Sequence, residues 1–134
     1  MQTSVFQDKT VLIVDDDPDV LTALTTAFVD CGASVTTAND GNEALQRAES
    51  DKPDLVVLDA MLPKRSGFLV LERLLAKKAP GEKPRVIMIT GNQGKRHQSW
   101  ARSLGVDAYL NKPFRMERLM ESAETLLGGM ANSE

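Results

Sequence analysis

The stretch VLIVDDDPDV, residues 11–20, places three consecutive aspartates directly after a four-residue apolar run. Like charges this close repel one another, by roughly 4 kcal/mol per pair at about 4 Å and an effective dielectric constant near 20. A short apolar run that ends abruptly is typical of a strand buried on both faces of a parallel sheet. The stretch therefore predicts a buried strand whose end carries an unusual concentration of negative charge.

Four more apolar, β-branched runs follow, and helical patterns separate them. The five expected strands lie at 11–14, 33–38, 55–58, 85–90 and 106–110. The first expected helix begins near Pro18 and ends before Gly32. The other four lie at 41–50, 67–78, 95–103 and 115–127. Strict alternation with short connections predicts an α/β fold, a doubly wound five-stranded parallel sheet with helices on both faces. A chain of this length suits one domain, spanning 1–134 with a core at about 10–127.

The composition is that of an ordinary globular protein with a mildly acidic charge. The 134 residues are 42% hydrophobic and 26% charged, and the net charge is −3. Such a chain has no overall attraction for nucleic acid or anionic lipid, so we expect no direct nucleic-acid binding and no membrane association. The single Cys31 cannot form an intrachain disulfide. No apolar stretch approaches the roughly 20 residues of a membrane span, and we expect a cytoplasmic protein.

Polar side chains follow every strand that we expect near the centre of the sheet. Asp15 and Asp16 follow the first strand, Asp59 the third, Thr90 ends the fourth, and Lys112 follows the fifth. Ligands of open α/β sheets bind at the carboxyl ends of the strands, close to the point where strand order reverses. The sequence therefore predicts one site at this edge of the sheet.

The residue types at this edge favour phosphoryl chemistry with a hard cation. Carboxylates without histidine or cysteine suit Mg²⁺, with Mn²⁺ as the alternative, better than zinc. Asp15 and Asp16 would hold the metal, and Lys112 adds a fixed positive charge that can stabilise phosphoryl oxygens. Asp59 stands alone at its strand end, which makes it the natural nucleophile for an acyl phosphate.

Five motifs together resemble the receiver domain of two-component response regulators. They are VLIVDD with Asp15 and Asp16, VVLDAMLP with Asp59, SGF with Gly67, VIMITG with Thr90, and DAYLNKPF with Tyr109 and Lys112. The resemblance runs from about residue 10 to 127. It implies the flavodoxin-like receiver fold and a phosphorelay signalling domain that catalyses only its own phosphorylation and dephosphorylation.

The resemblance also implies a role for each matching residue. Asp59 would accept phosphate from the phosphohistidine of a sensor histidine kinase or a phosphotransfer protein, and Thr90 and Lys112 would contact the phosphoryl oxygens. The implied metal ligands are Asp59 together with Asp15, Asp16 and the backbone carbonyl of Met61. Tyr109 would be the aromatic switch residue whose inward or outward position tracks phosphorylation.

The surface that a partner would read lies on the last two expected helices and the strand between them. Its residues are Lys95, Arg96, Trp100, Tyr109 and Arg115. Their basic character suggests an acidic-rimmed protein target or a second copy of the chain as the partner, rather than DNA. Two glycines in the segment 91–97 make it the expected moving part. The lone His97 is expected to be an exposed bystander, and Trp100 either a partner contact or a packing residue.

Other functions remain open from the sequence. Asp15-x-Asp17 satisfies the D-x-D pattern of small haloacid-dehalogenase-like phosphatases, in which Asp15 would be the nucleophile, but Asp59 would then have no role. A receiver-like module that is never phosphorylated would not need the full set of polar residues. A flavin mononucleotide binder is disfavoured because DDDPD would repel the phosphate.

Overall fold

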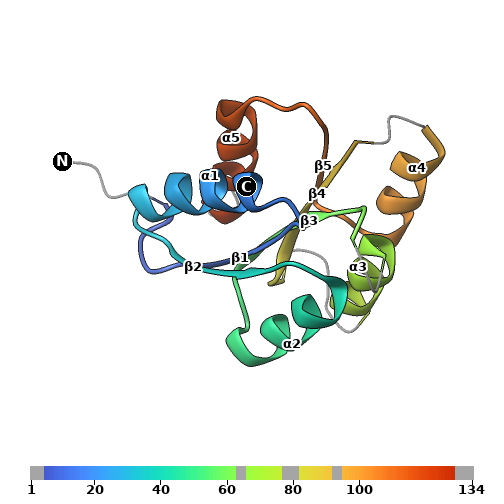
Figure 1. The fold of residues 1–134 in the computed structure, drawn as a ribbon, viewed down its shortest axis with the longest axis horizontal. Helices are drawn as coiled ribbons and strands as arrows, with labels where there is room; N and C mark the ends of the chain where they lie inside the picture. Colours follow the sequence, from blue (N-terminus) through green and yellow to red (C-terminus); the bar gives the residue numbers. More distant parts are fainter. Residues whose placement is uncertain (1–4, 63–65, 77–81, 92–94, 129–134) are drawn as a thin grey trace.

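Five parallel strands form one sheet in the computed structural model, which describes residues 5–62, 66–76, 82–91 and 95–128 (Figure 1). The strands are β1 (Thr10–Val14), β2 (Ser34–Ala38), β3 (Leu55–Asp59), β4 (Arg85–Thr90) and β5 (Ala108–Asn111). Their order across the sheet is β2-β1-β3-β4-β5, and each neighbouring pair is parallel. The order reverses between β1 and β3, which puts the switch point where the aspartates leave the sheet.

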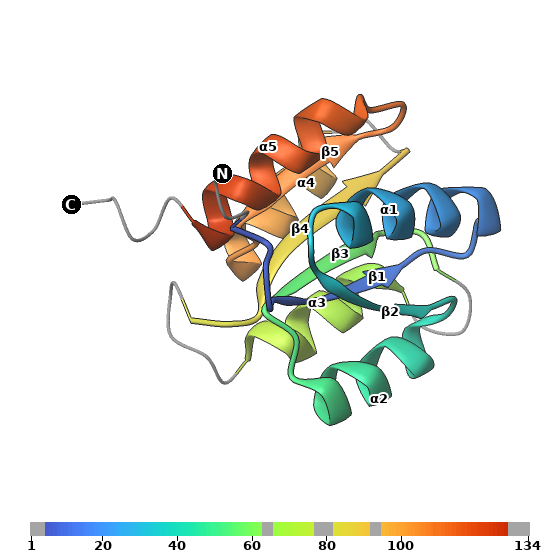
Figure 2. The same cartoon turned by 90° about the vertical axis from the view of Figure 1, so that its left-hand side faces the viewer.

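Helices cover both faces of the sheet, as the alternation predicted. They are α1 (Pro18–Asp30), α2 (Gly41–Asp51), α3 (Gly67–Leu75), α4 (Lys95–Leu104) and α5 (Met116–Leu127). α1 and α5 lie on one face, and α2, α3 and α4 lie on the other (Figures 1 and 2). The expected doubly wound fold is confirmed. None of the helices in the described ranges is both long and apolar enough to cross a membrane.

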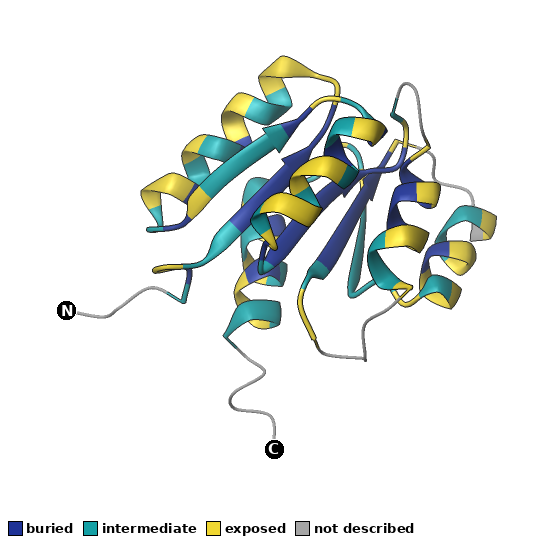
Figure 3. Cartoon of the chain, turned by 90° about the horizontal axis from the view of Figure 1, so that it is seen from below, coloured by how far each residue is buried: buried dark blue, intermediate teal, exposed yellow. Residues whose placement is uncertain are grey.

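The core consists of two layers, one on each face of the sheet. Alternate residues of each strand enter opposite layers: Leu12 and Val14 pack with α2, α3 and α4, whereas Val11 and Ile13 pack with α1 and α5. The central strands are therefore buried along their length, while β2 and β5 at the edges are partly exposed (Figure 3). Burial on both faces explains why β1, β3 and β4 are nearly continuous apolar runs.

Two element boundaries differ from the sequence prediction by more than one residue, the start of β5 and the end of α3. β5 begins at Ala108 instead of 106, because the Asp107 side chain accepts hydrogen bonds from the Val86 amide at 2.8 Å and Arg85 Nε at 3.0 Å. The Asp107 side chain thereby accepts from the Val86 amide, which a longer β5 would need for backbone pairing with β4. The sequence predicts that α3 continues to residue 78, but the helix ends at Leu75 and Ala76 is its C-cap. The prediction is therefore wrong for Ala76, and residues 77 and 78 lie outside the described ranges.

The core extends further toward the N-terminus than we expected. Phe6 is 4% exposed and packs edge-on against Phe28 of α1, with ring centroids 5.5 Å apart. Val5 packs against the same layer. The segment before β1 thus closes the end of the α1/α5 layer, although the predicted core began at about residue 10.

Candidate functional site

Two buried carboxylates emerge side by side from neighbouring strands. β1 and β3 pair in parallel with Val14 opposite Leu58, so the next residues, Asp15 and Asp59, leave the sheet together. Asp15 is 1% exposed and Asp59 is 3% exposed. One oxygen from each of these residues and one from the exposed Asp16 lie within 4.8 Å of one another. The structure therefore gathers the three acids that the sequence assigned to one site.

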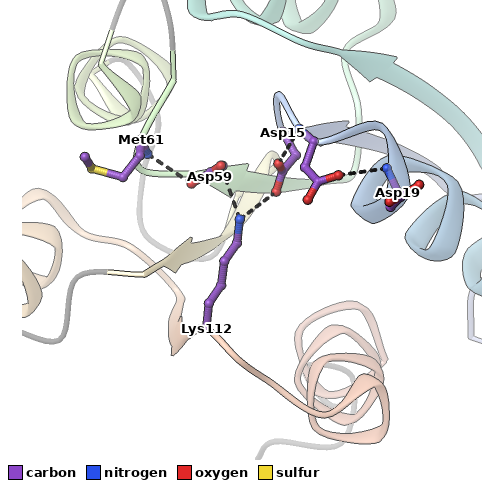
Figure 4. Close-up of polar contacts among 6 residues, drawn as sticks. Asp15, Asp19, Asp59, Met61 and Lys112 are labelled. Atoms are coloured by element: carbon purple, nitrogen blue, oxygen red, sulfur yellow. Dashed lines mark hydrogen bonds and ion pairs between the residues drawn. The ribbon is translucent and has the colours of Figure 1, made fainter.

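Lys112 lies between the two buried acids. Its ammonium nitrogen is 3.2 Å from Asp15 Oδ2 and 3.4 Å from Asp59 Oδ2 (Figure 4). The Lys112 amide donates to the Thr90 carbonyl at 2.7 Å, which continues the pairing of β4 with β5 and delivers the side chain to the site. A single ammonium group offsets part of the repulsion between the carboxylates.

Backbone amides fix the orientation of both buried carboxylates. Asp15 Oδ1 accepts from the Asp17 amide at 2.9 Å, and Asp59 Oδ1 accepts from the Met61 amide at 3.0 Å. The remaining oxygens, Asp15 Oδ2 and Asp59 Oδ2, face Lys112. Each acid thus keeps one oxygen held by the backbone and one directed into the site, as Figure 4 shows.

Asp17 belongs to the helix and not to the acid cluster. It is the N-cap of α1, and its side chain accepts from the Asp19 amide at 2.9 Å. Carboxylates at this end of a helix satisfy free amides and complement the helix dipole. The interpretation of Asp17 and Asp19 as helix-entry residues is confirmed.

Burial dominates the electrostatics of the site. It raises the pKa of Asp59 from its ordinary 3.8 to about 6; the hydrogen bond from Met61 opposes the rise, Asp15 adds to it, and Lys112 opposes it. Burial alone would lower the pKa of Lys112, but the charges of Asp59 and Asp15 outweigh it and hold that pKa above its ordinary value. Near neutral pH the site therefore contains a charged lysine beside a carboxylate that is expensive to ionise.

A glycine allows α3 to approach the end of β3 closely. A Cβ atom on Gly67 would clash with the Asp59 carbonyl oxygen and would lie 2.6 Å from the Ala60 Cα. The Gly67 amide donates to the Ala60 carbonyl at 3.0 Å, and Ser66 caps the helix through bonds from the Phe68 and Leu69 amides. Only glycine fits here, because the obstructing atoms are backbone.

Thr90 and Tyr109 lie together beside the site. Thr90 is fully buried at the end of β4, and the Tyr109 hydroxyl is buried. Burial raises the pKa of Tyr109, and the Thr90 side chain opposes that rise, which puts the hydroxyl next to Thr90. The Tyr109 ring packs with the core layer under α3 and α4. The pair predicted to form the switch is thus adjacent, with Tyr109 turned inward.

The aromatic residues of α4 pack against Phe68 of α3. Trp100 is 47% exposed, but its ring stacks on Phe68 of α3 with centroids 4.5 Å apart and an interplanar angle of 3°. His97 lies 5.4 Å from the same ring and is only partly exposed, so its description as an exposed bystander is wrong. Both residues turn toward α3, and residues 92–94 of the expected moving segment lie outside the described ranges.

The donors at this edge fit a hard divalent cation. All three acids offer oxygen, two of them are held by backbone amides, and neither nitrogen nor sulfur ligands take part. Such a set suits Mg²⁺ or Mn²⁺, which prefer carboxylate and water oxygens. Asp15, Asp16 and Asp59 would hold the ion, and the carbonyl of Met61 remains a predicted ligand.

Known structures with this arrangement are receiver domains. A CheY-like response regulator receiver domain protein from Methanospirillum hungatei superimposes with a TM-score of 0.85 and 28% identity, over 94% of this chain and 98% of that one. The receiver domain of the Francisella response regulator 1452 gives a TM-score of 0.83, also at 28% identity, over 92% of this chain and 99% of that one. The fold and the acidic edge therefore define the class as a receiver-type signalling domain.

Sequence comparison gives the family directly. The family model for the response regulator receiver domain matches residues 11–124, and the chain belongs to that family. The transcriptional regulatory protein PhoP for alkaline phosphatase synthesis in Bacillus subtilis is 36% identical over 120 residues, 90% of this chain and 49% of the relative. Response regulator MprA of Mycolicibacterium vanbaalenii is 36% identical over 117 residues, 87% of this chain and 49% of the relative. The chain spans about half the length of these curated relatives.

Family membership removes the phosphatase alternative. That reading needed Asp15 and Asp17 to act together, whereas Asp17 caps α1 and the acid cluster takes Asp59 instead. The chain is a receiver domain of the two-component response regulators, a family of phosphoacceptor domains that work with histidine kinases.

Proposed function

We propose that Asp59 is the phosphoacceptor of this receiver domain and that Asp15, Asp16 and Lys112 assist the transfer. The observation that carries the proposal is the position of Asp59 Oδ2, buried and 3.4 Å from the Lys112 ammonium, with oxygens of Asp15 and Asp16 within 4.8 Å. Water would screen the charge of fully exposed acids at a strand end, so such acids would not need a neighbouring ammonium group. A nucleophile that must meet an anionic phosphoryl group does need it.

The transfer would use the oxygen of Asp59 that faces the site. Asp59 Oδ2 attacks the phosphorus of a partner's phosphohistidine and forms a P–O bond while the P–N bond breaks. The electron pair of that bond stays on the imidazole nitrogen, which takes up a proton. Bound Mg²⁺ would supply positive charge that neutralises the phosphoryl oxygens. Lys112 contributes a second positive charge, and Thr90 offers its hydroxyl.

Asp59 must be ionised to act as a nucleophile. Its pKa of about 6 leaves the carboxylate mostly ionised above neutral pH, so it can act as a nucleophile there. The Met61 amide holds Oδ1, which leaves Oδ2 directed toward the incoming group. Bound Mg²⁺ would favour the ionised carboxylate further, so in its presence we expect phosphorylation to slow only well below pH 6.

A groove beside the site supports a protein as the phosphate donor. It has a volume of about 560 Å³ and lies between α1 and the segment after β5. Its lining is mostly apolar and reaches the site through Lys112: Val20, Ala23, Leu24, Phe114, Met116 and Lys112. An apolar groove that ends at Lys112, which contacts Asp59, suits a helix of a histidine kinase or phosphotransfer protein.

The output surface would be α4, β5 and α5. Tyr109 on β5 lies inward beside Thr90, so a phosphoryl group that draws Thr90 toward Asp59 changes the space around the Tyr109 ring. Such a group biases two arrangements that already exist. The partner would be a downstream protein or a second copy of the chain, and residues 1–134 would act as one domain.

Acetyl phosphate with Mg²⁺ tests the proposal. We expect intact-mass analysis to show one added phosphoryl group on the wild type and none on Asp59→Asn. Asp30→Asn, which removes an exposed carboxylate from the end of α1, is the matched control and should be phosphorylated normally. Wild-type phosphate uptake by Asp59→Asn would contradict the assignment.

A further inference from the structure

We propose that the groove between α2 and α3, at the edge of the sheet opposite the aspartates, binds a small amphipathic anion. The groove has a volume of about 460 Å³. It lies beside Pro53 before β3 and Pro84 before β4, whereas Asp15 and Asp59 follow the other ends of the strands. This inference does not depend on phosphorylation of Asp59.

The floor of the groove is apolar and continuous with the core. Leu45 and Ala48 come from α2, Leu74 comes from α3, and all three pack against the buried layer on this face of the sheet. Pro53 is buried beneath them. A concave apolar site of a few hundred cubic ångströms has the size of a small-molecule pocket, which favours a compact ligand over an extended protein surface.

The rim carries more positive than negative charge. Lys52, Arg73 and Lys83 line it together with Glu49, in a chain whose net charge is −3. Lys83 lies 3.6 Å from Asp54, so part of its charge is already compensated. Lys52 and Arg73 form no ion pair with any residue in the described ranges. Two exposed cations beside an apolar floor match a ligand with an apolar body and one anionic head.

The backbone of Lys52 has a conformation that lysine rarely adopts. Lys52 is the C-cap of α2 and has a φ of 47°, in the left-handed region where glycine or asparagine is the usual residue. A lysine at this position accepts an unfavourable conformation and places a long cation at the groove. Lys52→Gly therefore removes the charge without demanding a new backbone conformation.

A matched pair of ligands tests the chemistry. We would titrate the ¹⁵N-labelled protein with 4-phenylbutyrate and with its neutral amide, 4-phenylbutyramide, and follow the amide resonances by NMR. The anion should give saturable shifts that cluster at residues 45–53, 73–75 and 83–85. The amide should bind about tenfold more weakly, because it loses charge-assisted hydrogen bonds.

Charge variants identify the residues responsible. Lys52→Gly combined with Arg73→Gln should reduce the affinity for 4-phenylbutyrate to that for the amide. Arg102→Gln, which removes an exposed cation from α4, is the control and should leave both affinities unchanged. Shifts outside the groove, equal affinity for the two ligands, or an equal effect of Arg102→Gln would each overturn the proposal.

One structural explanation of the cations makes the opposite prediction. Lys52 and Arg73 lie at the C-terminal ends of their helices, where positive charge complements the helix dipole. If this is their whole role, the double variant loses thermal stability and 4-phenylbutyrate gives no saturable shifts with the wild type. That result would also overturn the proposal.

Discussion

The ammonium nitrogen of Lys112 lies 3.4 Å from the Asp59 carboxylate, although 53 positions separate the two residues in the chain. The same nitrogen is 3.2 Å from Asp15. Without the Lys112 ammonium group, the buried carboxylates of Asp15 and Asp59 would lose the positive charge that contacts both of them. Lys112 thus offsets part of the repulsion between the two carboxylates in the metal-free site.

Removal of Lys112 should destabilise the metal-free protein. Lys112→Ala leaves Asp15 and Asp59 close together without the ammonium, and we expect a loss of about 1–3 kcal/mol in the free energy of unfolding. Lys83→Ala breaks an ion pair whose lysine is 60% exposed, and should cost less than about 1 kcal/mol. Urea unfolding at pH 7.5 with EDTA measures both. Equal losses would show that the buried acids gain nothing from Lys112.

The raised pKa of Asp59 predicts a pH-dependent effect of Asp59→Asn. Between its ordinary pKa of 3.8 and about 6, the folded wild type binds more protons at this group than the unfolded chain does. The wild type therefore loses stability as the pH rises through this window. Asn cannot ionise, so the variant should be more stable than the wild type by about 1–3 kcal/mol at pH 7.5 and by little at pH 4.

Urea unfolding in EDTA at the two pH values checks this prediction. Saturating Mg²⁺ is the control, because a bound cation favours the ionised carboxylate and should reduce the advantage of the variant at pH 7.5. The same gain at pH 4 and pH 7.5 would mean that packing, and not charge, causes the difference.

Metal binding should require the acids that follow β1. The double variant Asp15→Ala, Asp16→Ala should lose Mg²⁺ affinity in calorimetry and should gain stability without metal, because like-charge repulsion is relieved. Asp17→Ala is the matched control: it removes the N-cap of α1, should cost about 1 kcal/mol of stability, and should leave Mg²⁺ affinity nearly unchanged. Wild-type affinity in the double variant would contradict the site.

The sequence carried most of the information about the site because its residues follow strands in a fixed order. Because β1, β3 and β4 are buried on both faces, they are nearly continuous apolar runs that can be recognised in the sequence. Parallel pairing then brings Asp15, Asp59 and Lys112 to one edge of the sheet. The acids and the lysine could therefore be assigned together without any distance being known.

Contacts between elements far apart in the chain could not be predicted in this way. The stack of Phe68 on Trp100 depends on how α3 and α4 lie relative to each other, which periodicity does not encode. Phe6 precedes the first strand and has no pattern of its own, so its packing against Phe28 was missed. The Asp107 side chain accepts from the Val86 amide and so sets the start of β5 at Ala108, a side-chain contact that strand propensity does not predict.

Gly67 should be far less tolerant of substitution than Gly91. Gly67→Ala would bring a methyl group against the Asp59 carbonyl and Ala60 backbone, so α3 must shift, and we expect a loss of about 1–3 kcal/mol. A Cβ on Gly91 meets nothing within 4 Å, and Gly91→Ala should be nearly neutral. Thermal unfolding distinguishes the two. Similar melting temperatures for both variants would show that α3 can move away from β3 at little cost.

The last prediction uses Trp100 as a reporter of Asp59, the proposed phosphoacceptor. Gly67 packs on the backbone of Asp59, the next residue is Phe68, and the Phe68 ring stacks on Trp100 at 4.5 Å. A change at Asp59 that moves the start of α3 should therefore alter the environment of this half-exposed indole. Trp100 is the only tryptophan in the chain, so its fluorescence can be assigned without ambiguity.

Beryllofluoride, which stands in for the phosphoryl group on Asp59, should change the intensity or emission maximum of Trp100 when Mg²⁺ is present. Asp59→Asn should show no change, because the carboxylate that beryllofluoride attaches to is absent. Phe68→Leu keeps an apolar side chain but removes the stacked ring, and should reduce the response while Asp59 still takes up phosphate from acetyl phosphate. An undiminished response in Phe68→Leu would mean that α4 senses the site by a route that does not pass through this stack.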